Sequence, residues 1–184
     1  MFTHDTYKKR RAGLLSHIKS GIILILGNSE VGMNYPSNTY RFRQDSSFLY
    51  LFGLDEPDVA GVIDADSGEE ILFGNDVTMD DIIWMGPQPA LAEKAEWAGV
   101  KKSMQYDHLQ SYISEQRAKG RKIHYLPPYR DYNKILLSKL LSQSIDSVMN
   151  EVSESLIKAV VALREIKEQC EIEEMDKAAN IGYM

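Results

Sequence analysis

The sequence predicts an α/β domain with a mixed β-sheet flanked by helices, and three observations lead to this fold class. A helical segment at 5–20 runs into a continuous apolar stretch, Ile22–Leu26, which is typical of a strand buried on both faces. Short apolar strands and helical segments then alternate along the chain, as they do in α/β sheets. Two strands, at 59–63 and 71–73, flank the turn-forming residues 64–68, so a hairpin makes the sheet mixed.

The N-terminal helix places Leu14 and Ile18 at helical spacing behind the basic run Lys8-Lys9-Arg10-Arg11. We interpret this basic run as a solvated helix face. Gly21 is expected to end the helix, because glycine tolerates positive φ. Residues 28–38, rich in Gly, Asn, Ser and Pro, are expected to form a loop.

After the hairpin, a short helix following Thr78 carries Ile82, Ile83 and Trp84 and stops at Gly86-Pro87. The remaining expected elements are a helix at 90–98, a strand at 101–106, a helix at 109–118, a strand at 122–126, a helix at 133–141 and helix from 151 onward, with one brief interruption allowed.

Residues 164–179 are expected to form a charged amphipathic helix. Its apolar stripe consists of Ile166, Cys170, Ile172, Met175 and Ala179. Because no later segment covers that stripe, we expect the chain to be the beginning of a larger protein. The alternative is a helix that packs back on its own domain or on a second copy.

Composition narrows the possible partners and the compartment. The 184-residue chain has a net charge of −6, which gives no excess of basic residues for binding nucleic acid. Its single cysteine, Cys170, allows no intrachain disulfide, and the first apolar run lies too far from the N-terminus to be a secretory signal. We expect a soluble cytoplasmic protein with no nucleic-acid or membrane partner.

No pattern in the sequence predicts a catalytic centre. The histidines have no partner at helical metal-ligand spacing and are expected at the surface or on strands; they are His4, His17, His108 and His124. The carboxylates that cluster are expected in turns, helix starts and loops; they are Asp64 with Asp66, Asp80 with Asp81, and Asp55, Glu56 and Asp58. The 27–32 loop lacks a phosphate-binding pattern, and Cys170 has no histidine nearby in sequence. A ribonuclease-H-type nuclease is disfavoured because the first strand carries no carboxylate.

The segment 40–58 reads YRFRQDSSFLYLFGLDEPD and resembles a signature of the Xaa-Pro aminopeptidase (aminopeptidase P) family. The residues that carry the resemblance are Phe42, Arg43, Gln44, Asp45, Ser46, Phe48, Tyr50, Gly53, Glu56 and Pro57. Residues 40–58 are called the signature segment below. Ser47 departs from the family pattern, where several members have Asp. The tail from Arg164 through Lys167 to Met175 is similar to the helix that leads into the family's catalytic domain.

The resemblance implies a creatinase-like N-terminal domain of ribonuclease-H-like architecture. It divides the chain into a non-catalytic domain at 1–163 and, at 164–184, the start of a helix leading to a C-terminal metallopeptidase domain. That second domain would hold two divalent metal ions, manganese in many members, and remove the residue that precedes proline. The chain itself would hold no metal and be inactive alone. It would shape substrate access for peptides and contribute contacts in a homo-oligomer.

Two residue-level questions stay open in the sequence. By resemblance, Trp84 lines the substrate pocket of a neighbouring subunit; alternatively, it packs between helix and sheet. Residues of the signature segment either contact substrate or form an ion-paired loop, with Arg41, Arg43 and Asp45, that locks a short helix against the sheet. In that helix we expect Ser46 to be the cap and Phe48, Leu49, Leu51 and Phe52 to be buried. A stand-alone binding or scaffold domain without a peptidase partner is the alternative function.

Overall fold

The computed structural model describes residues 2–183, apart from the side chains of Asp80, Asp81 and Met85. Its main sheet has five strands in the order β6-β5-β4-β1-β7. They are β1 (Ile22–Leu26), β4 (Ala60–Asp64), β5 (Glu70–Gly74), β6 (Lys102–Gln105) and β7 (Ile123–Tyr125). β4 is antiparallel to both β1 and β5, whereas β7 is parallel to β1 and β6 is parallel to β5. The predicted mixed sheet with a β4–β5 hairpin is confirmed.

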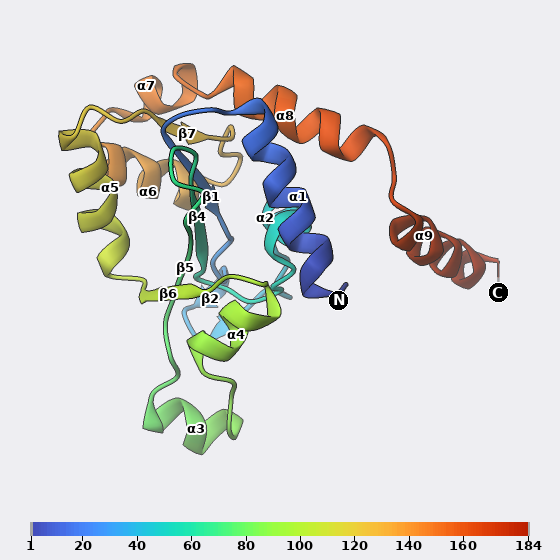
Figure 1. The fold of residues 1–184 in the computed structure, drawn as a ribbon. Coiled ribbons are helices and arrows are strands. Elements are labelled where there is room, and N and C mark those ends of the chain that lie inside the picture. Colours follow the sequence, from blue (N-terminus) through green and yellow to red (C-terminus); the bar gives the residue numbers. More distant parts are fainter. Residues whose placement is uncertain (1, 184) are drawn as a thin grey trace.

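Helices cover both faces of this sheet (Figure 1), and alternate residues of β1, which lies between β4 and β7, point to opposite sides. Ile23 and Ile25 of β1 pack with α1 (His4–His17), α2 (Ser46–Phe52), α4 (Leu91–Trp97) and α8 (Glu154–Glu165). Ile22 and Leu24 face α5 (His108–Ala118), α6 (Asp131–Leu141) and α7 (Ile145–Asn150). The strand is therefore buried on both faces, as its continuous apolar run predicted.

Some expected elements differ from the structure. The first helix ends at His17 rather than at Ser20, so Gly21, with φ of 92°, lies just before β1 instead of ending the helix. The loop expected at 28–38 contains a small hairpin of β2 (Gly32–Tyr35) and β3 (Asn38–Thr39). All four residues of β2 are exposed, so it lacks the apolar alternation that marks a strand in sequence. Helix α7 was also not predicted.

Two elements stand away from the body (Figure 1): α3 (Met79–Met85), and α9 (Gln169–Gly182) beyond α8. The brief interruption allowed in the helical region from 151 onward is present at residues 166–168, between α8 and α9, so the continuous helix expected at 164–179 is wrong. Ile166 is 77% exposed, Met175 is 57% exposed and Cys170 is half-buried, so the described part of the domain leaves most of the expected apolar stripe uncovered. No helix within residues 2–183 has the length and apolar character needed to cross a bilayer.

Candidate functional site

Gln44 is the centre of the signature segment and is only 4% exposed. Its Oε1 accepts hydrogen bonds from the backbone N–H of Asn28 at 2.7 Å and of Asp45 at 2.9 Å. Its Nε2 donates to the carbonyl oxygens of Leu54 at 3.3 Å and Glu56 at 2.6 Å. The Gln44 side-chain amide thus joins the segment that follows β1 to the segments before and after α2, and all of its hydrogen-bonding groups are used.

Helix α2 is capped by Asp45, so the expectation that Ser46 caps it is wrong. Asp45 Oδ1 accepts from the N–H groups of Ser47 and Phe48, both at 2.9 Å. This satisfies two of the N–H groups that a helix start leaves free. Asp and Ser are both favoured N-cap residues, so the sequence alone does not show which of the adjacent residues Asp45 and Ser46 caps the helix. The resemblance also put Ser47 where relatives have a carboxylate; here its Oγ lies 3.4 Å from Arg164 Nη1.

The buried face of α2 packs on the sheet. Phe48 and Phe52 are fully buried and their rings stack with centroids 5.0 Å apart. Leu49, however, is 40% exposed, so its predicted burial is wrong. Arg41, Arg43 and Asp45 join no ion pair among the described residues, so the ion-paired loop that we considered ahead of α2 is wrong. Amide and cap hydrogen bonds hold this part of the signature segment instead.

The second half of the segment is also held from outside. Gly53 ends α2 with φ of 72°, and the ring of Tyr7 lies directly against its Cα. Lys94 of α4 forms an ion pair with Glu56. Pro57 follows Glu56, is half-buried, and is separated from β4 by two residues. These contacts connect the signature segment to α1 and α4.

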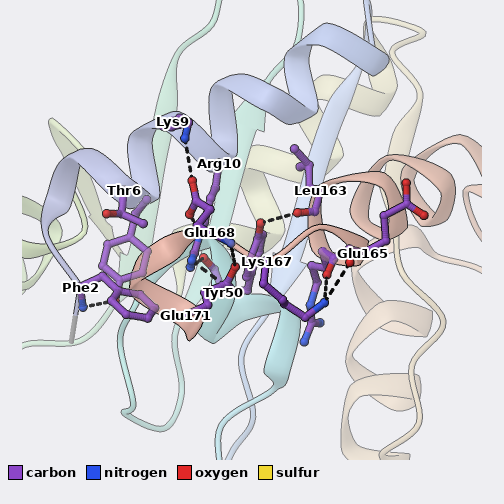
Figure 2. A network of polar contacts seen from close by, with 12 residues as sticks. Phe2, Thr6, Lys9, Arg10, Tyr50, Leu163, Glu165, Lys167, Glu168 and Glu171 are labelled. Atoms are coloured by element: carbon purple, nitrogen blue, oxygen red, sulfur yellow. Dashed lines mark hydrogen bonds and ion pairs between the residues drawn. The ribbon is translucent and has the colours of Figure 1, made fainter. Parts of the chain in front are cut away.

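Tyr50 joins α2 to α1 and α8 (Figure 2). Its hydroxyl donates to the carbonyl oxygen of Leu163 at 2.9 Å. Arg10 Nη1 donates to the Tyr50 carbonyl at 3.0 Å, and the Arg10 guanidinium carbon lies 4.0 Å from the Tyr50 ring centroid. Burial raises the pKa of the Tyr50 hydroxyl, which keeps it protonated as a donor.

Arg10 also contacts the start of α9 (Figure 2). Its Nε lies 3.1 Å from Glu168 Oε2, and its Nη2 lies 3.4 Å from Glu171 Oε1. Lys9 Nζ donates to Glu168 Oε1 at 2.8 Å, and this hydrogen bond is the main cause of the lowered pKa of Glu168. The carboxylates of the 168–171 turn are therefore tied to α1.

The basic run 8–11 is not the solvated helix face that we expected. Arg10 is 3% exposed and Arg11 is fully buried. Arg11 Nη1 donates to the Leu51 carbonyl at 2.7 Å. Its Nη2 lies 2.8 Å from Glu70 Oε2 and forms an ion pair with it, although the N–H does not point at the oxygen well enough for a hydrogen bond. Only Lys8 and Lys9 are exposed.

Trp84 lies on α3 and is 87% exposed. The alternative that it packs between helix and sheet is therefore wrong. Its contact with a neighbouring subunit's substrate remains a prediction.

The other candidate residues lie apart from the signature segment. His4, His17 and His108 are exposed, whereas His124 on β7 is 6% exposed. His124 Nε2 donates to the Ser20 carbonyl at 3.1 Å, Nδ1 lies 2.7 Å from Ser153 Oγ, and burial lowers its pKa. Within the described residues no group of His, Cys, Asp or Glu is placed to hold a metal ion. The Asp80 and Asp81 side chains lie outside the described part.

The Asp64–Asp66 pair is part of the β4–β5 turn, as predicted. Arg121 Nη1 donates to Asp64 Oδ2 at 2.9 Å, and Nη2 pairs with both Asp64 and Asp66. Asp64 Oδ1 also accepts from the N–H of Asp66 at 2.9 Å. The hydrogen bond from Arg121 lowers the pKa of Asp64 to about 2.

Asp64→Asn is expected to lower the free energy of unfolding at pH 7 by about 2 kcal/mol. Because folding lowers the pKa of Asp64 from 3.8 to about 2, its contribution is complete above pH 4 and is lost as the pH falls toward 2. Urea unfolding between pH 2 and pH 7 should therefore show a shallower acid-induced loss for the variant than for the wild type. The exposed Glu115→Gln serves as the control, and parallel acid curves for wild type and Asp64→Asn would contradict the assignment.

The comparisons with known proteins agree with this fold. Zinc-substituted E. coli aminopeptidase P in complex with product superimposes with a TM-score of 0.66 at 19% identity, over 83% of this chain and 35% of that chain. The E. coli enzyme with the inhibitor Pro-Leu gives a TM-score of 0.65 at 19% identity, over the same shares of the two chains. The class of protein is thus an α/β domain with the fold seen in one part of aminopeptidase P.

Sequence similarity identifies the family. The family described as "Aminopeptidase P, N-terminal domain" matches residues 7–124, and the chain belongs to this family. A probable Xaa-Pro aminopeptidase of Aspergillus niger is 31% identical over 104 residues, which are 56% of this chain and 21% of that protein. Human Xaa-Pro dipeptidase is 31% identical over 101 residues, 54% of this chain and 20% of that protein. A probable Xaa-Pro aminopeptidase of Aspergillus terreus is 25% identical over 175 residues, 95% of this chain and 35% of that protein. The chain therefore spans only a minor part of the length of these relatives.

Proposed function

We propose that this chain serves as the N-terminal, non-catalytic domain of a cytoplasmic, metal-dependent Xaa-Pro aminopeptidase. Its partner is a C-terminal catalytic domain of the same protein, which holds two divalent metal ions, manganese by family resemblance, and cleaves the bond before proline. The domain shapes access for peptide substrates and contributes contacts in a homo-oligomer. The described residues of this chain do not fit a metal site, so no chemical step is assigned to them.

The observation that carries this proposal is the match of residues 7–124 to the aminopeptidase P N-terminal domain family. The exposed apolar surface of α3 supports the proposed role in substrate access and oligomer contacts. Trp84 is 87% exposed, Ile83 72% and Met79 73%, on a helix that stands away from the sheet (Figure 1). Exposed tryptophan and methionine side chains are typical of surfaces that bind another molecule. This supports a role for Trp84 in contacting a neighbouring subunit or its substrate.

The start of α9 supports the division of the chain into a domain at 1–163 and a connecting segment at 164–184. All residues of α9 are described, and none is buried. Its start is held by the ion pairs of Lys9 and Arg10 with Glu168 and Glu171. Because α9 is fixed to α1 at its first turn and is otherwise uncovered, it is well suited to set the orientation of the proposed catalytic domain relative to this domain.

Two assays test the proposal. In the first assay, the chain alone is incubated with Mn²⁺ and an Xaa-Pro peptide and is expected to show no hydrolysis. In the second, the complete protein that its gene encodes carries Trp84→Ala, which is expected to lower kcat/KM for that peptide about tenfold. Trp97→Ala, which removes the tryptophan of α4, is the control and should change kcat/KM little. Robust hydrolysis by the chain alone would contradict the non-catalytic role. A complete protein without a metallopeptidase domain would favour the stand-alone binding domain.

A further inference from the structure

Three arginines line one groove of about 230 Å³ at an edge of the sheet. Arg41 and Arg43 come from the signature segment, and Arg130 lies in the loop between β7 and α6. The other lining residues are Ser29, Glu30, Val31, Tyr40 and Phe42. Residues 29–31 follow β1 and Arg130 follows β7, and these two strands are parallel neighbours. Ligand sites in α/β folds commonly lie beyond the carboxyl ends of such strands.

These arginines have no counter-ion in the part of the chain that the structure describes. No salt bridge joins Arg41, Arg43 or Arg130 to a carboxylate within residues 2–183. Arg130 Nε is buried and has no hydrogen-bond partner. By contrast, Arg10 and Arg11 are each paired with carboxylates. A guanidinium N–H without an acceptor is unfavourable, and three arginines without a paired carboxylate favour an anionic ligand in the groove.

A buried side chain holds the two sides of the groove together. Asn28 is 1% exposed, and its Nδ2 donates to the Arg43 carbonyl at 2.9 Å and to the Tyr129 hydroxyl at 3.1 Å. The Arg130 guanidinium carbon lies 5.9 Å from the Tyr129 ring centroid. Asn28 is itself fixed by Gln44 through its backbone N–H. The backbone that carries Arg43 and the Tyr129 ring next to Arg130 are therefore fixed before any ligand arrives, which lowers the entropic cost of binding.

We propose that this arginine groove binds a carboxylate, either the C-terminal carboxylate of a peptide or an acidic side chain of a partner polypeptide. Guanidinium groups match the planar carboxylate with paired, charge-assisted hydrogen bonds. Tyr40 and Phe42 add aromatic surface for the part of the ligand next to that carboxylate. Glu30, which also lines the groove, disfavours a doubly charged phosphate more than a singly charged carboxylate. This site is independent of the proposed role in a peptidase.

The site can be tested by titrations that are monitored with two-dimensional NMR. The readout is the set of backbone N–H and arginine Nε–H signals of the ¹⁵N-labelled chain. The probes are N-acetyl-triglycine, its C-terminal amide, a capped peptide with one glutamate side chain, and inorganic phosphate, each up to about 10 mM. Saturable shifts at Arg43 and Arg130 are expected with the first or the third probe, and this difference identifies the source of the carboxylate. Equal shifts with the amide, tighter binding of phosphate, or no shift with either carboxylate would overturn the proposal.

Single substitutions separate the groove from general charge effects. Arg43→Gln and Arg130→Gln are each expected to weaken carboxylate binding about tenfold. Arg117→Gln removes the same charge from an exposed position on α5 and should leave binding unchanged. Because Arg130 has no counter-ion, Arg130→Gln should not lower the Tm of the free chain. If Arg117→Gln weakens binding as much as the groove variants do, or if Arg130→Gln lowers the Tm without affecting binding, the groove is not the site. Arg41→Gln, at an exposed position, provides the binding test should either of the other variants fail to fold.

Discussion

Replacing Gln44 by leucine is expected to lower the free energy of unfolding by about 4 kcal/mol, because the amide makes four hydrogen bonds that leucine cannot make. The substitution leaves the N–H of Asn28 and the carbonyl of Leu54 without these partners, and both residues are only 1% exposed. Leucine fits the space, so the loss arises from unsatisfied polar groups rather than from a cavity. Urea or thermal unfolding measures it directly.

Gln44→Glu sharpens this test. A glutamate keeps the two acceptor interactions, but its ionised carboxylate would face the carbonyl oxygens of Leu54 and Glu56, to which the Gln44 amide donates. The variant should therefore be strongly destabilised at pH 7 and should lose less stability near pH 4, where a protonated carboxyl regains one donor.

Gln110→Leu, on the exposed surface of α5, is the control and should cost less than about 0.5 kcal/mol. Equal losses for Gln44→Leu and Gln110→Leu would show that the Gln44 network does not stabilise the fold.

The sequence predicted the sheet well because its information is local. The run Ile22–Leu26 has apolar residues on both faces, and the 64–68 turn joins two apolar arms, so each strand is identified by its own residues. The β2–β3 hairpin was missed because its exposed residues show no apolar alternation. Element boundaries at His17 and at 166–168 depend on tertiary contacts, and sequence patterns locate them less accurately.

The polar contacts of the site could not be predicted, because their partners are distant in sequence. Arg11 is separated by 40 residues from Leu51, whose carbonyl accepts its hydrogen bond. Arg10 is 158 residues away from Glu168. Arg43 and Arg130 meet at one groove only because β1 and β7 are neighbours in the sheet. Composition and spacing describe such arginines as solvated, and only the fold shows which of them are buried and which lack a carboxylate.

The glycine of the signature segment is expected to be even less replaceable than Gln44. Gly53 has φ of 72°, and a Cβ at this position would lie 2.1 Å from Tyr7 Cζ. Gly53→Ala therefore combines a left-handed backbone with a collision against a ring that is only 3% exposed. We expect a loss of about 4 kcal/mol or more in the free energy of unfolding, measured by urea unfolding.

A matched glycine and a second-site change separate these two causes. Gly68 has φ of 75°, and no heavy atom lies within 4 Å of the place that an alanine Cβ would occupy there, so Gly68→Ala should cost only the backbone term, about 1 kcal/mol. In a Tyr7→Ala background the collision disappears, and Gly53→Ala should then also cost about 1 kcal/mol. If Gly53→Ala and Gly68→Ala are equally destabilising in the wild-type background, the close contact with Tyr7 is not what requires glycine here. If they differ as expected, the signature glycine is explained by the approach of α1 to the end of α2, a structural requirement of the domain and not a catalytic one.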